Sequence, residues 1–175
     1  MRGETYRRIE RYDDALSDFD RAIELEPQDA FTLASRGETY RRIERYDDAL
    51  RDLNRAIELN SEADWAFYSV ALVYRALDQK ADMSTNINKA IHLAEQSYEA
   101  NPQDWSSAVS LALYSLVAGE TGSAKQLYEK VLSVQAPPHI INEAINDLDD
   151  FLALVPDHAQ ARHFRDLLWR NRQQN

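Results

Sequence analysis

The chain has 175 residues, of which 44% are hydrophobic, and this length and composition suit one folded domain. It contains no cysteine, which excludes a disulfide framework and thiolate metal sites and favours a cytoplasmic location. Its net charge of −10 argues against nucleic acid and anionic membranes as partners. With only four glycines and five prolines among long stretches rich in alanine, leucine, glutamate and arginine, the sequence predicts helices throughout.

The N-terminal part of the chain contains an internal repeat. The segment Arg2 to Leu16 recurs unchanged as Arg36 to Leu50, and 22 of the 34 aligned positions of the two copies are identical. A period of this length is typical of stacked helical hairpins, because each hairpin has an apolar face that only its neighbours can bury. The sequence therefore predicts an all-α solenoid of helical hairpins.

The spacing of small and large residues within this period resembles the tetratricopeptide repeat. In the first copy these positions hold Gly3, Tyr6, Ala15, Phe19, Ala22 and Pro27. In the second copy they hold Gly37, Tyr40, Ala49, Leu53 and Ala56, with Ser61 in place of the proline. We expect Gly37 and Ala49 to let the two helices of a hairpin approach closely, while Tyr40 and Leu53 fill the space between hairpins. The resemblance implies a right-handed solenoid of about ten helices.

A third copy is degenerate and longer. Its apolar positions stay in register as far as Ile91, although Met83 stands where a small residue is expected. The next Asn-Pro pair, at Asn101 and Pro102, comes seven residues late, and seven residues make two helical turns. We therefore expect the second helix of this repeat to run from about Ala81 to Ala100 with its apolar face in phase.

Two further units follow the long helix. The pattern resumes at Trp105, and Pro137 and Pro138 then break the chain before a helix from about His139 to Leu154. An amphipathic helix from His158 to Arg172 is predicted to cap the C-terminal end. We expect a single domain with repeats at residues 1–29, 30–63, 64–104, 105–136 and 137–156. The last repeat is degenerate and lacks most of its first helix. The capping helix is expected at residues 157–175.

The first helix of the first repeat has no opening turn, because Met1 falls at about the sixth position of the period. This predicts a truncated repeat with an outer face that is partly apolar and uncapped. Near-identical tandem copies are similar to the tetratricopeptide arrays at the C-termini of large bacterial signalling proteins. By that analogy we expect a larger parent protein.

In this family the first helix of each hairpin lines a concave groove, and the resemblance places particular residues there. The positions expected to be exposed are Glu4, Arg7 and Arg8 in the first repeat, Phe31, Ala34, Glu38, Arg41 and Arg42 in the second, and Trp65, Tyr68, Leu72 and Arg75 in the third. Arg7, Arg41 and Arg75 form a ladder of arginines beside aromatic side chains. Guanidinium groups bind carboxylates through paired hydrogen bonds, and aromatic residues anchor interfaces. We therefore predict a protein or peptide partner with acidic and apolar residues.

Some of these charges have a simpler interpretation. Glu4 with Arg8 and Glu38 with Arg42 are spaced i,i+4, and such pairs stabilise a helix by about 0.2–0.5 kcal/mol each. We prefer this role for Arg8 and Arg42. The family's carboxylate clamp for chaperone tails uses Lys and Asn at positions where this chain has Ala34 and Glu38, which argues against that specialised function.

The first helix of the fourth repeat is apolar nearly all round, at Val109, Leu113, Leu116 and Val117. Such a helix must be covered. We expect the cover to come from the chain's own long third-repeat helix or from its C-terminal helices. An apolar anchor supplied by a partner is the alternative.

The sequence lacks motifs that carry chemistry. A zinc-binding spacing is lacking among the four histidines, which are His92, His139, His158 and His163. The acidic run of Asp147, Asp149 and Asp150 lies on a predicted helix and lacks the loop glycine of a calcium site. No glycine-rich phosphate loop, nucleophile motif or membrane-length apolar run occurs. We predict no enzymatic activity, no metal and no cofactor.

Three functional hypotheses remain open from the sequence. The first is a protein-interaction module that binds a partner segment in its groove. The second is a scaffold or sensor arm of a larger signalling protein, suggested by the truncated first repeat. The third is self-association, as a homodimer, through the uncapped N-terminal repeat.

Overall fold

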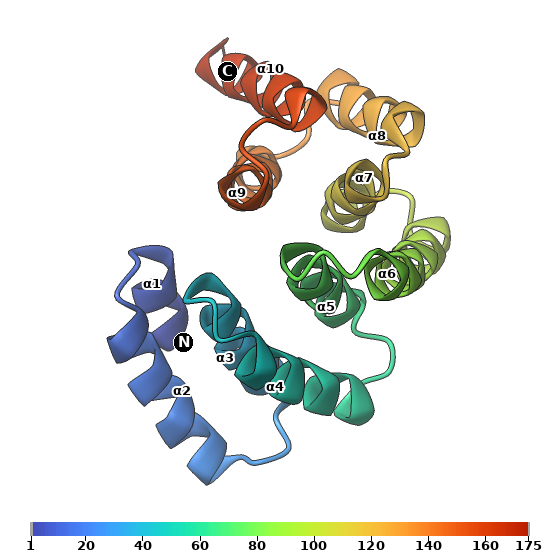
Figure 1. Ribbon diagram of the computed structural model, residues 1–175. Coiled ribbons are helices and arrows are strands. Elements are labelled where there is room, and N and C mark those ends of the chain that lie inside the picture. The colour runs from blue at the N-terminus through green and yellow to red at the C-terminus, as the bar shows by residue number, and fades with distance from the viewer. Residues whose placement is uncertain (1, 175) are drawn as a thin grey trace. The chain divides into compact units, whose positions relative to one another are not determined.

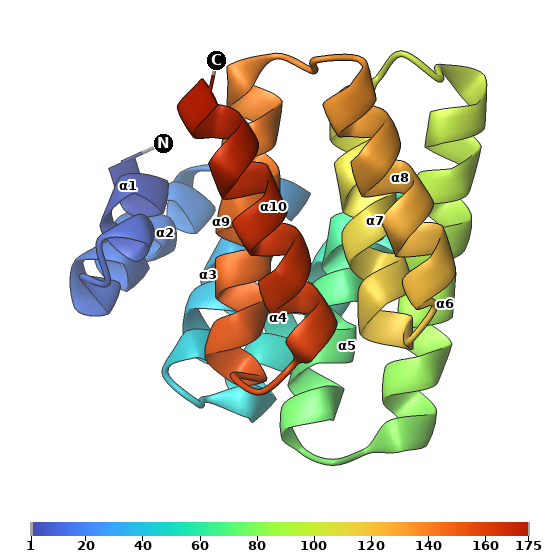
Figure 2. The same cartoon turned by 90° about the horizontal axis from the view of Figure 1, so that it is seen from above.

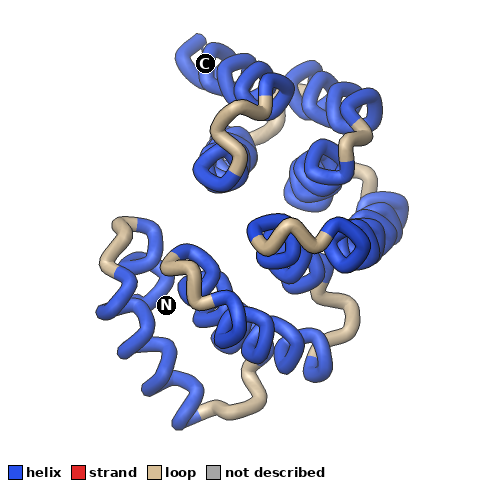
Figure 3. The backbone as a smooth tube through the Cα atoms, viewed as in Figure 1, coloured by secondary structure: helices blue, strands red, loops and turns tan. Residues whose placement is uncertain are grey.

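The repeat in the sequence folds as pairs of antiparallel helices. The computed structural model describes the backbone of residues 2–174 and their side chains except those of Glu4, Arg8 and Gln174. Within this part of the chain every regular element is an α-helix, and there are ten of them (Figure 1, Figure 3), as predicted. They form two units, Met1–Asn86 and Ile87–Asn175. None of the helices described combines the length and the hydropathy needed to cross a lipid bilayer.

The first unit holds the two near-identical hairpins and the first helix of the third. In the first hairpin α1 (Arg2–Arg8) pairs with α2 (Tyr12–Leu25), and in the second α3 (Ala30–Arg42) pairs with α4 (Tyr46–Leu59) (Figure 1). These are followed by α5 (Asp64–Ala76) and by the start of α6 (Lys80–Ala100). Because α2 also packs on α3 and α4 on α5, each second helix contacts the first helices of two successive hairpins.

The turn inside each of these hairpins has the same backbone conformation. Glu10, Glu44 and Asp78, which are equivalent positions of the three repeats, have φ values of 59°, 61° and 54° in the left-handed region. At the middle turn the amide of Arg45 donates to the carbonyl of Tyr40 at 2.9 Å and closes the end of α3. The repeat in sequence is thus a repeat in backbone geometry.

The insertion in the third repeat lies within α6. This helix has 21 residues and spans Lys80–Ala100, which confirms the predicted extension. The next left-handed turn residue is Gly119, with φ of 90°, and it follows Asp78 by more than one full repeat. The hairpin turn therefore returns in its usual form after an insertion of two helical turns.

Close contact between α3 and α4 centres on Gly37. A Cβ atom at Gly37 would lie 2.9 Å from Cγ of Leu53 and 3.1 Å from the carbonyl oxygen of Ala49. Leu53 and Ala49 are completely buried. In the first hairpin Gly3 has the same relation to the ring of Phe19, at 2.8 Å. The close approach predicted at Gly37 and Ala49 is confirmed, and Leu53 packs at this crossing within the hairpin.

The second unit contains the rest of α6 and four more helices, which are α7 (Trp105–Ala118), α8 (Thr121–Ser133), α9 (Pro138–Leu154) and α10 (Ala159–Gln174). α7 pairs with α8 and α9 with α10, while α7 also packs on α9 and α8 on α10 (Figure 2). The sequence predicted a degenerate unit followed by a separate capping helix. In the structure these two segments form a hairpin, because α9 is a full helix of 17 residues that packs along α10.

The apolar helix α7 is covered from within the chain. Val109, Leu113, Leu116 and Val117 are all buried, and α8 and α9 both pack on α7. This confirms the expectation that C-terminal helices of the chain provide the cover. Burial on all sides explains why the sequence of α7 has no polar face.

Substitution of Gly37 tests the close approach of the paired helices. Gly37→Ala should lower the free energy of unfolding by about 1–3 kcal/mol, because overpacking against Leu53 and the Ala49 carbonyl exceeds the gain in helix propensity. The matched control is Gly122→Ala within α8. A Cβ atom there would meet nothing within 4 Å, so the free energy of unfolding should not fall. Urea unfolding of both variants provides the measurement. Equal effects in the two variants would contradict the packing role of Gly37.

Tyr128 in α8 offers a test of the core of the second unit. It is 1% exposed, its ring centroid lies 5.1 Å from that of Phe164, and no described group forms a hydrogen bond with its hydroxyl. Burial, with a smaller effect of Asp147, raises the pKa of this phenol well above its ordinary value. Tyr128→Phe should therefore raise the free energy of unfolding by about 1 kcal/mol, because a buried unpaired hydroxyl is removed.

Tyr98→Phe is the control for this experiment. The hydroxyl of Tyr98 accepts a hydrogen bond from Lys130, so removing this hydroxyl should not raise the free energy of unfolding. Thermal unfolding of both variants compares them under the same conditions. A Tyr128→Phe variant less stable than the parent chain would show that the hydroxyl is paired in solution.

Candidate functional site

The residues predicted to line a groove lie on the first helices of the first unit. α1, α3 and α5 carry them at equivalent positions of successive repeats. Arg7, Arg41 and Arg75 are one such set, and Phe31 and Trp65 are another. The repeat thus places like residues at corresponding points of successive first helices.

Phe31 and Trp65 pack on each other in the first turns of α3 and α5. Their ring centroids are 6.0 Å apart and their planes meet at 66°, an edge-to-face arrangement. Asp29 fixes the start of α3, because its carboxylate accepts a hydrogen bond from the Phe31 amide at 3.1 Å. Trp65 packs against the core of the unit, whereas 51% of Phe31 remains exposed. The pair therefore has one supported side and one side open to solvent.

Three residues predicted to be exposed on this face are buried. Ala34, Arg41 and Leu72 are 3%, 7% and 2% exposed. Ala34 belongs to a core cluster that includes Ala49 and Val70, and the apolar side chain of Leu72 gains from burial. The expectation of exposure was wrong for these residues, because helix position alone does not determine how closely neighbouring helices approach.

Glu38 connects the arginines of this face. The guanidinium of Arg41 donates to both oxygens of Glu38, at 2.8 and 2.6 Å, and Nε of Arg42 donates to the same carboxylate at 3.3 Å. The pair with Arg42 was predicted, but the closer pair with Arg41 was not. Burial alone would raise the pKa of Glu38, but Arg41, Arg42 and Arg7 outweigh it and lower this pKa to about 2. Glu38 is therefore ionised, and it holds the buried guanidinium of Arg41 in place.

The remaining predicted residues complete the description of the face. Arg7, Tyr68 and Arg75 are half-buried. The predicted pair of Glu4 with Arg8 lies outside the side chains that the structure describes. The structure brings together two groups, one being Phe31 with Trp65 and the other the arginine cluster around Glu38.

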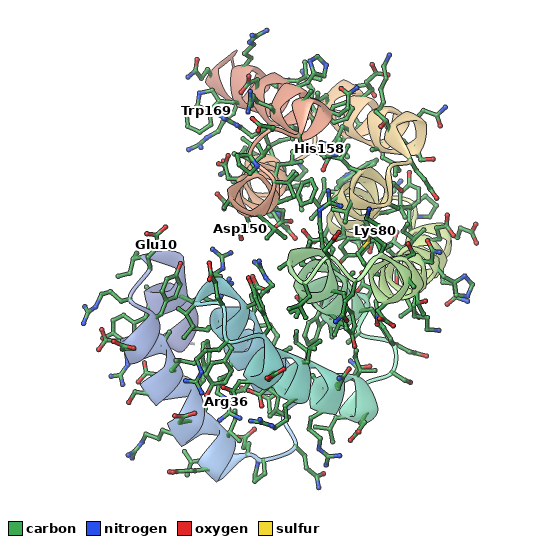
Figure 4. All side chains as sticks on the ribbon, viewed as in Figure 1. Glu10, Arg36, Lys80, Asp150, His158 and Trp169 are labelled. Atoms are coloured by element: carbon green, nitrogen blue, oxygen red, sulfur yellow. The ribbon has the colours of Figure 1, made fainter. Side chains whose placement is uncertain are left out.

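Arg36 joins the first two hairpins, a role that was not predicted from the sequence. Its Nε and Nη2 atoms donate to the two carboxylate oxygens of Asp52 in α4 at 2.6 and 2.9 Å, and its Nη1 atom donates to Asp20 in α2 at 2.8 Å. Figure 4 shows Arg36 between α2 and α4. The signal was present in the sequence, because Arg2 and Asp18 have the same separation along the chain as Arg36 and Asp52.

Comparison with known proteins agrees with this architecture. A family model described as tetratricopeptide repeat matches residues 1–62. Residues 1–62 thus match the tetratricopeptide repeat family, and the helical fold of the chain agrees with that match. A search of curated proteins finds no match.

Solved structures, tetratricopeptide repeat proteins among them, share the fold over two thirds or more of the chain. TTC0263, a thermophilic protein of Thermus thermophilus, aligns with a TM-score of 0.58 at 18% identity and covers 95% of each chain. PilF of Pseudomonas aeruginosa aligns with a TM-score of 0.56 at 17% identity, over 97% of this chain and 72% of PilF. The first tetratricopeptide domain of Spaghetti (RPAP3), bound to the HSP90 peptide SRMEEVD, gives 0.51 at 19% identity, over 67% of this chain and 88% of that domain. At these identities the likeness shows the shared fold.

Tetratricopeptide repeats are in general interaction modules without catalytic activity. Among the side chains that the structure describes, no group of three or more His, Cys, Asp or Glu could hold a metal ion. One of the histidines considered for zinc has a structural contact instead, since Nδ1 of His158 accepts a hydrogen bond from the Ala161 amide at the start of α10, at 3.2 Å.

Acid is expected to remove the contribution of Glu38 to stability. The folded pKa of about 2 lies below the ordinary value of 4.5, so ionised Glu38 stabilises the folded state fully above about pH 4.5. This contribution is lost as the pH falls toward 2. Glu38→Gln should lower the free energy of unfolding by on the order of 2 kcal/mol at neutral pH, and its difference from the parent chain should shrink in acid. Urea unfolding at a series of pH values measures this difference.

Glu58→Gln is the matched control for Glu38. Glu58 and its partner Arg55 are 64% and 49% exposed, and such surface pairs contribute roughly 0–1 kcal/mol. A Glu38→Gln variant that is as stable as the parent chain at neutral pH would contradict the stabilising role of ionised Glu38. So would a stability difference that stays constant through the acid range.

Proposed function

We propose that this tetratricopeptide repeat protein is a protein-interaction module that binds an extended or helical partner segment on the first helices of its first unit. We call this surface the arginine-aromatic face, and its residues are Arg7, Phe31, Glu38, Trp65, Tyr68 and Arg75. Arg41 and Leu72, which were predicted to belong to it, are buried and would not contact the partner directly. The observation that carries the proposal is the Phe31 ring, which packs edge-on against Trp65 and yet is 51% exposed.

An apolar side chain of the partner would complete the burial of Phe31. Full burial of such a side chain contributes about 1.5–3 kcal/mol, and about half of the Phe31 surface is still available. Aromatic side chains held by their neighbours are frequent binding hot spots. Because Trp65 and the fixed start of α3 already restrict Phe31, little conformational entropy is lost when a partner binds.

The arginines support a preference for partner segments that also carry acidic residues. Arg7, Arg41 and Arg75 stand at the same position of three successive first helices, and Glu38 interacts with three guanidinium groups. Arg41 is buried and bound to both carboxylate oxygens of Glu38. In this proposal it contributes to the electrostatic potential of the surface without contacting the partner. Arg7 and Arg75, which are half-buried, would lie closer to the carboxylates of the partner.

The partner segment proposed here differs from the HSP90 peptide seen on the Spaghetti domain. The carboxylate clamp of the family uses Lys and Asn where this chain has buried Ala34 and ionised Glu38. An ionised glutamate at that position repels a terminal carboxylate instead of binding it. We therefore propose that the partner is bound through an internal segment.

Truncation of Phe31 tests the proposed surface. Peptides selected against the full chain from a diverse displayed library are expected to contain apolar and acidic residues, with weaker binding at high salt. Phe31→Ala should then raise the dissociation constant of these peptides about tenfold or more, while leaving the fold intact because the ring is half exposed. Fluorescence anisotropy with labelled peptides provides the measurement.

Leu25→Ala is the matched control for this experiment. Leu25 is 75% exposed and lies at the end of α2, a second helix outside the arginine-aromatic face. Its truncation should leave the affinity unchanged. Equal affinities of the Phe31→Ala variant and the parent chain would exclude the proposed anchor, and a library that yields no binder would exclude this mode of function.

A further inference from the structure

The stretches of chain that hold the aromatic pair carry negative charge only. Between Arg21 and Arg36 there are three acidic residues and no lysine or arginine, and the same is true between Arg55 and Arg75. The acidic residues of the two stretches are Glu24, Glu26, Asp29, Glu58, Glu62 and Asp64. Phe31 lies in the first stretch and Trp65 in the second, so their pair is surrounded along the chain by carboxylates.

The carboxylates nearest to the rings are held by the starts of α3 and α5. Asp29 accepts hydrogen bonds from the Phe31 amide and from the hydroxyl of Thr32. Asp64 is the first residue of α5 and directly precedes Trp65. The amide of Glu62 donates to Oδ1 of Asn60 at 3.1 Å, which orders the loop before α5. The side chain of Glu62 is exposed and forms no ion pair with the described part of the chain.

The arginines lie at the opposite end of the same helices. Arg41 and Arg42 belong to the last turn of α3, and Arg75 belongs to the last turn of α5. Trp65 and Arg75 are ten residues apart on one helix, which corresponds to about 15 Å along its axis. This order of charges suits the helix dipoles, so the charges by themselves do not indicate a ligand. The exposed ring at the negative end does.

An exposed aromatic ring among carboxylates favours a cation. Cations are attracted to the faces of aromatic rings, and nearby negative charge adds to this attraction. The chain itself makes such contacts elsewhere, since the guanidinium of Arg45 lies 4.4 Å from the ring centroid of Tyr40. Within the described side chains no cation of the chain lies over Phe31 or Trp65. The ring planes of this pair meet at 66°, so the two faces form a corner.

We propose that the Phe31–Trp65 end of the arginine-aromatic face binds a lysine or arginine side chain of the partner segment. This inference rests on the proposed function and names the chemistry of one part of its site. The methylene stem of such a side chain would cover the exposed part of the Phe31 ring. Its charged end would lie near the carboxylates of Asp29 and Glu62, which supply the charge complementarity.

The two ends of the face then call for opposite charges on the partner. A basic residue binds at the aromatic pair, and acidic residues lie toward Arg75, about 15 Å away. This separation corresponds to about four or five residues of an extended segment, or to about ten residues of a helical one. The partner is therefore bound in one direction along α5.

Two small probes test the cation site directly. Nα-acetyl-lysine amide and Nα-acetyl-norleucine amide have similar stems, and only the first carries an ammonium group. The indole N–H signal of Trp65, assigned with Trp65→Phe, reports their binding to the full chain by NMR. We expect the dissociation constant of the lysine probe to be at least about threefold lower, with a smaller ratio at high salt. Phe31→Ala should remove this preference.

Substitution of two carboxylates separates charge from fold. Asp29→Asn keeps a good N-cap for α3, and Glu62→Gln changes an exposed side chain. The double variant should weaken binding of the lysine probe about threefold or more and leave binding of the norleucine probe unchanged. The matched control is Glu99→Gln with Glu129→Gln, which removes two exposed carboxylates from the second unit and should alter neither dissociation constant.

Selected peptides distinguish failure of this inference from failure of the proposed function. Phe31-dependent peptides that lack a basic residue, and whose affinity is unchanged in the Asp29→Asn, Glu62→Gln variant, would overturn the cation site and leave the proposed function standing. A lysine probe that binds no better than the norleucine probe would overturn the cation site whatever the library yields. A lysine preference without any library binder would exclude the partner segment as its occupant.

Discussion

The close approach of two helices at a glycine determines most of the first unit. At Gly37 the backbone of α3 meets Leu53 and the Ala49 carbonyl of α4 with no room for a methyl group. Side chains near this crossing are enclosed, and any charge among them must find a partner within the protein. Phe31 lies six residues earlier, about 9 Å along the helix axis, and this distance from the crossing is consistent with its exposure.

Two charged groups show how this constraint is met. Arg36 and Asp52 pair across the hairpin, and Glu38 pairs with Arg41 along one helix. Both arrangements keep ionised groups near the core, where an unpaired charge would be strongly destabilising. The same first helices also carry the aromatic pair of Phe31 and Trp65, and Phe31 remains half exposed. The stabilising ion pairs and the proposed binding surface thus lie on neighbouring residues of the same helices.

The period of the sequence was sufficient to predict the helices, because each hairpin depends on the same few small and large residues. It placed α6 within one residue of its observed limits, Lys80–Ala100. It did not predict that α9 and α10 form a hairpin, since Ala144, Leu148 and Phe151 also fit the pattern of a second helix. Exposure on the proposed arginine-aromatic face was predicted correctly for Phe31 but not for Arg41. Glu38 pairs with both its i+3 neighbour Arg41 and its i+4 neighbour Arg42, and sequence spacing does not indicate which of the two guanidinium groups is buried.

Because α1 copies part of α3 and α2 nearly copies α4, the unfolded chain contains two almost interchangeable pairs of helices. α3 can collapse onto α2 as if they formed one hairpin, and such a pairing must dissociate before the native one forms. The residues that distinguish the correct partner are the few that differ, such as Phe19 against Leu53 and Asp20 against Asn54. The size of the side chain that packs on the helix glycine and the charge that faces Arg36 then favour the native pairing. Making the two copies identical would therefore slow productive folding even where the final structure is equally stable.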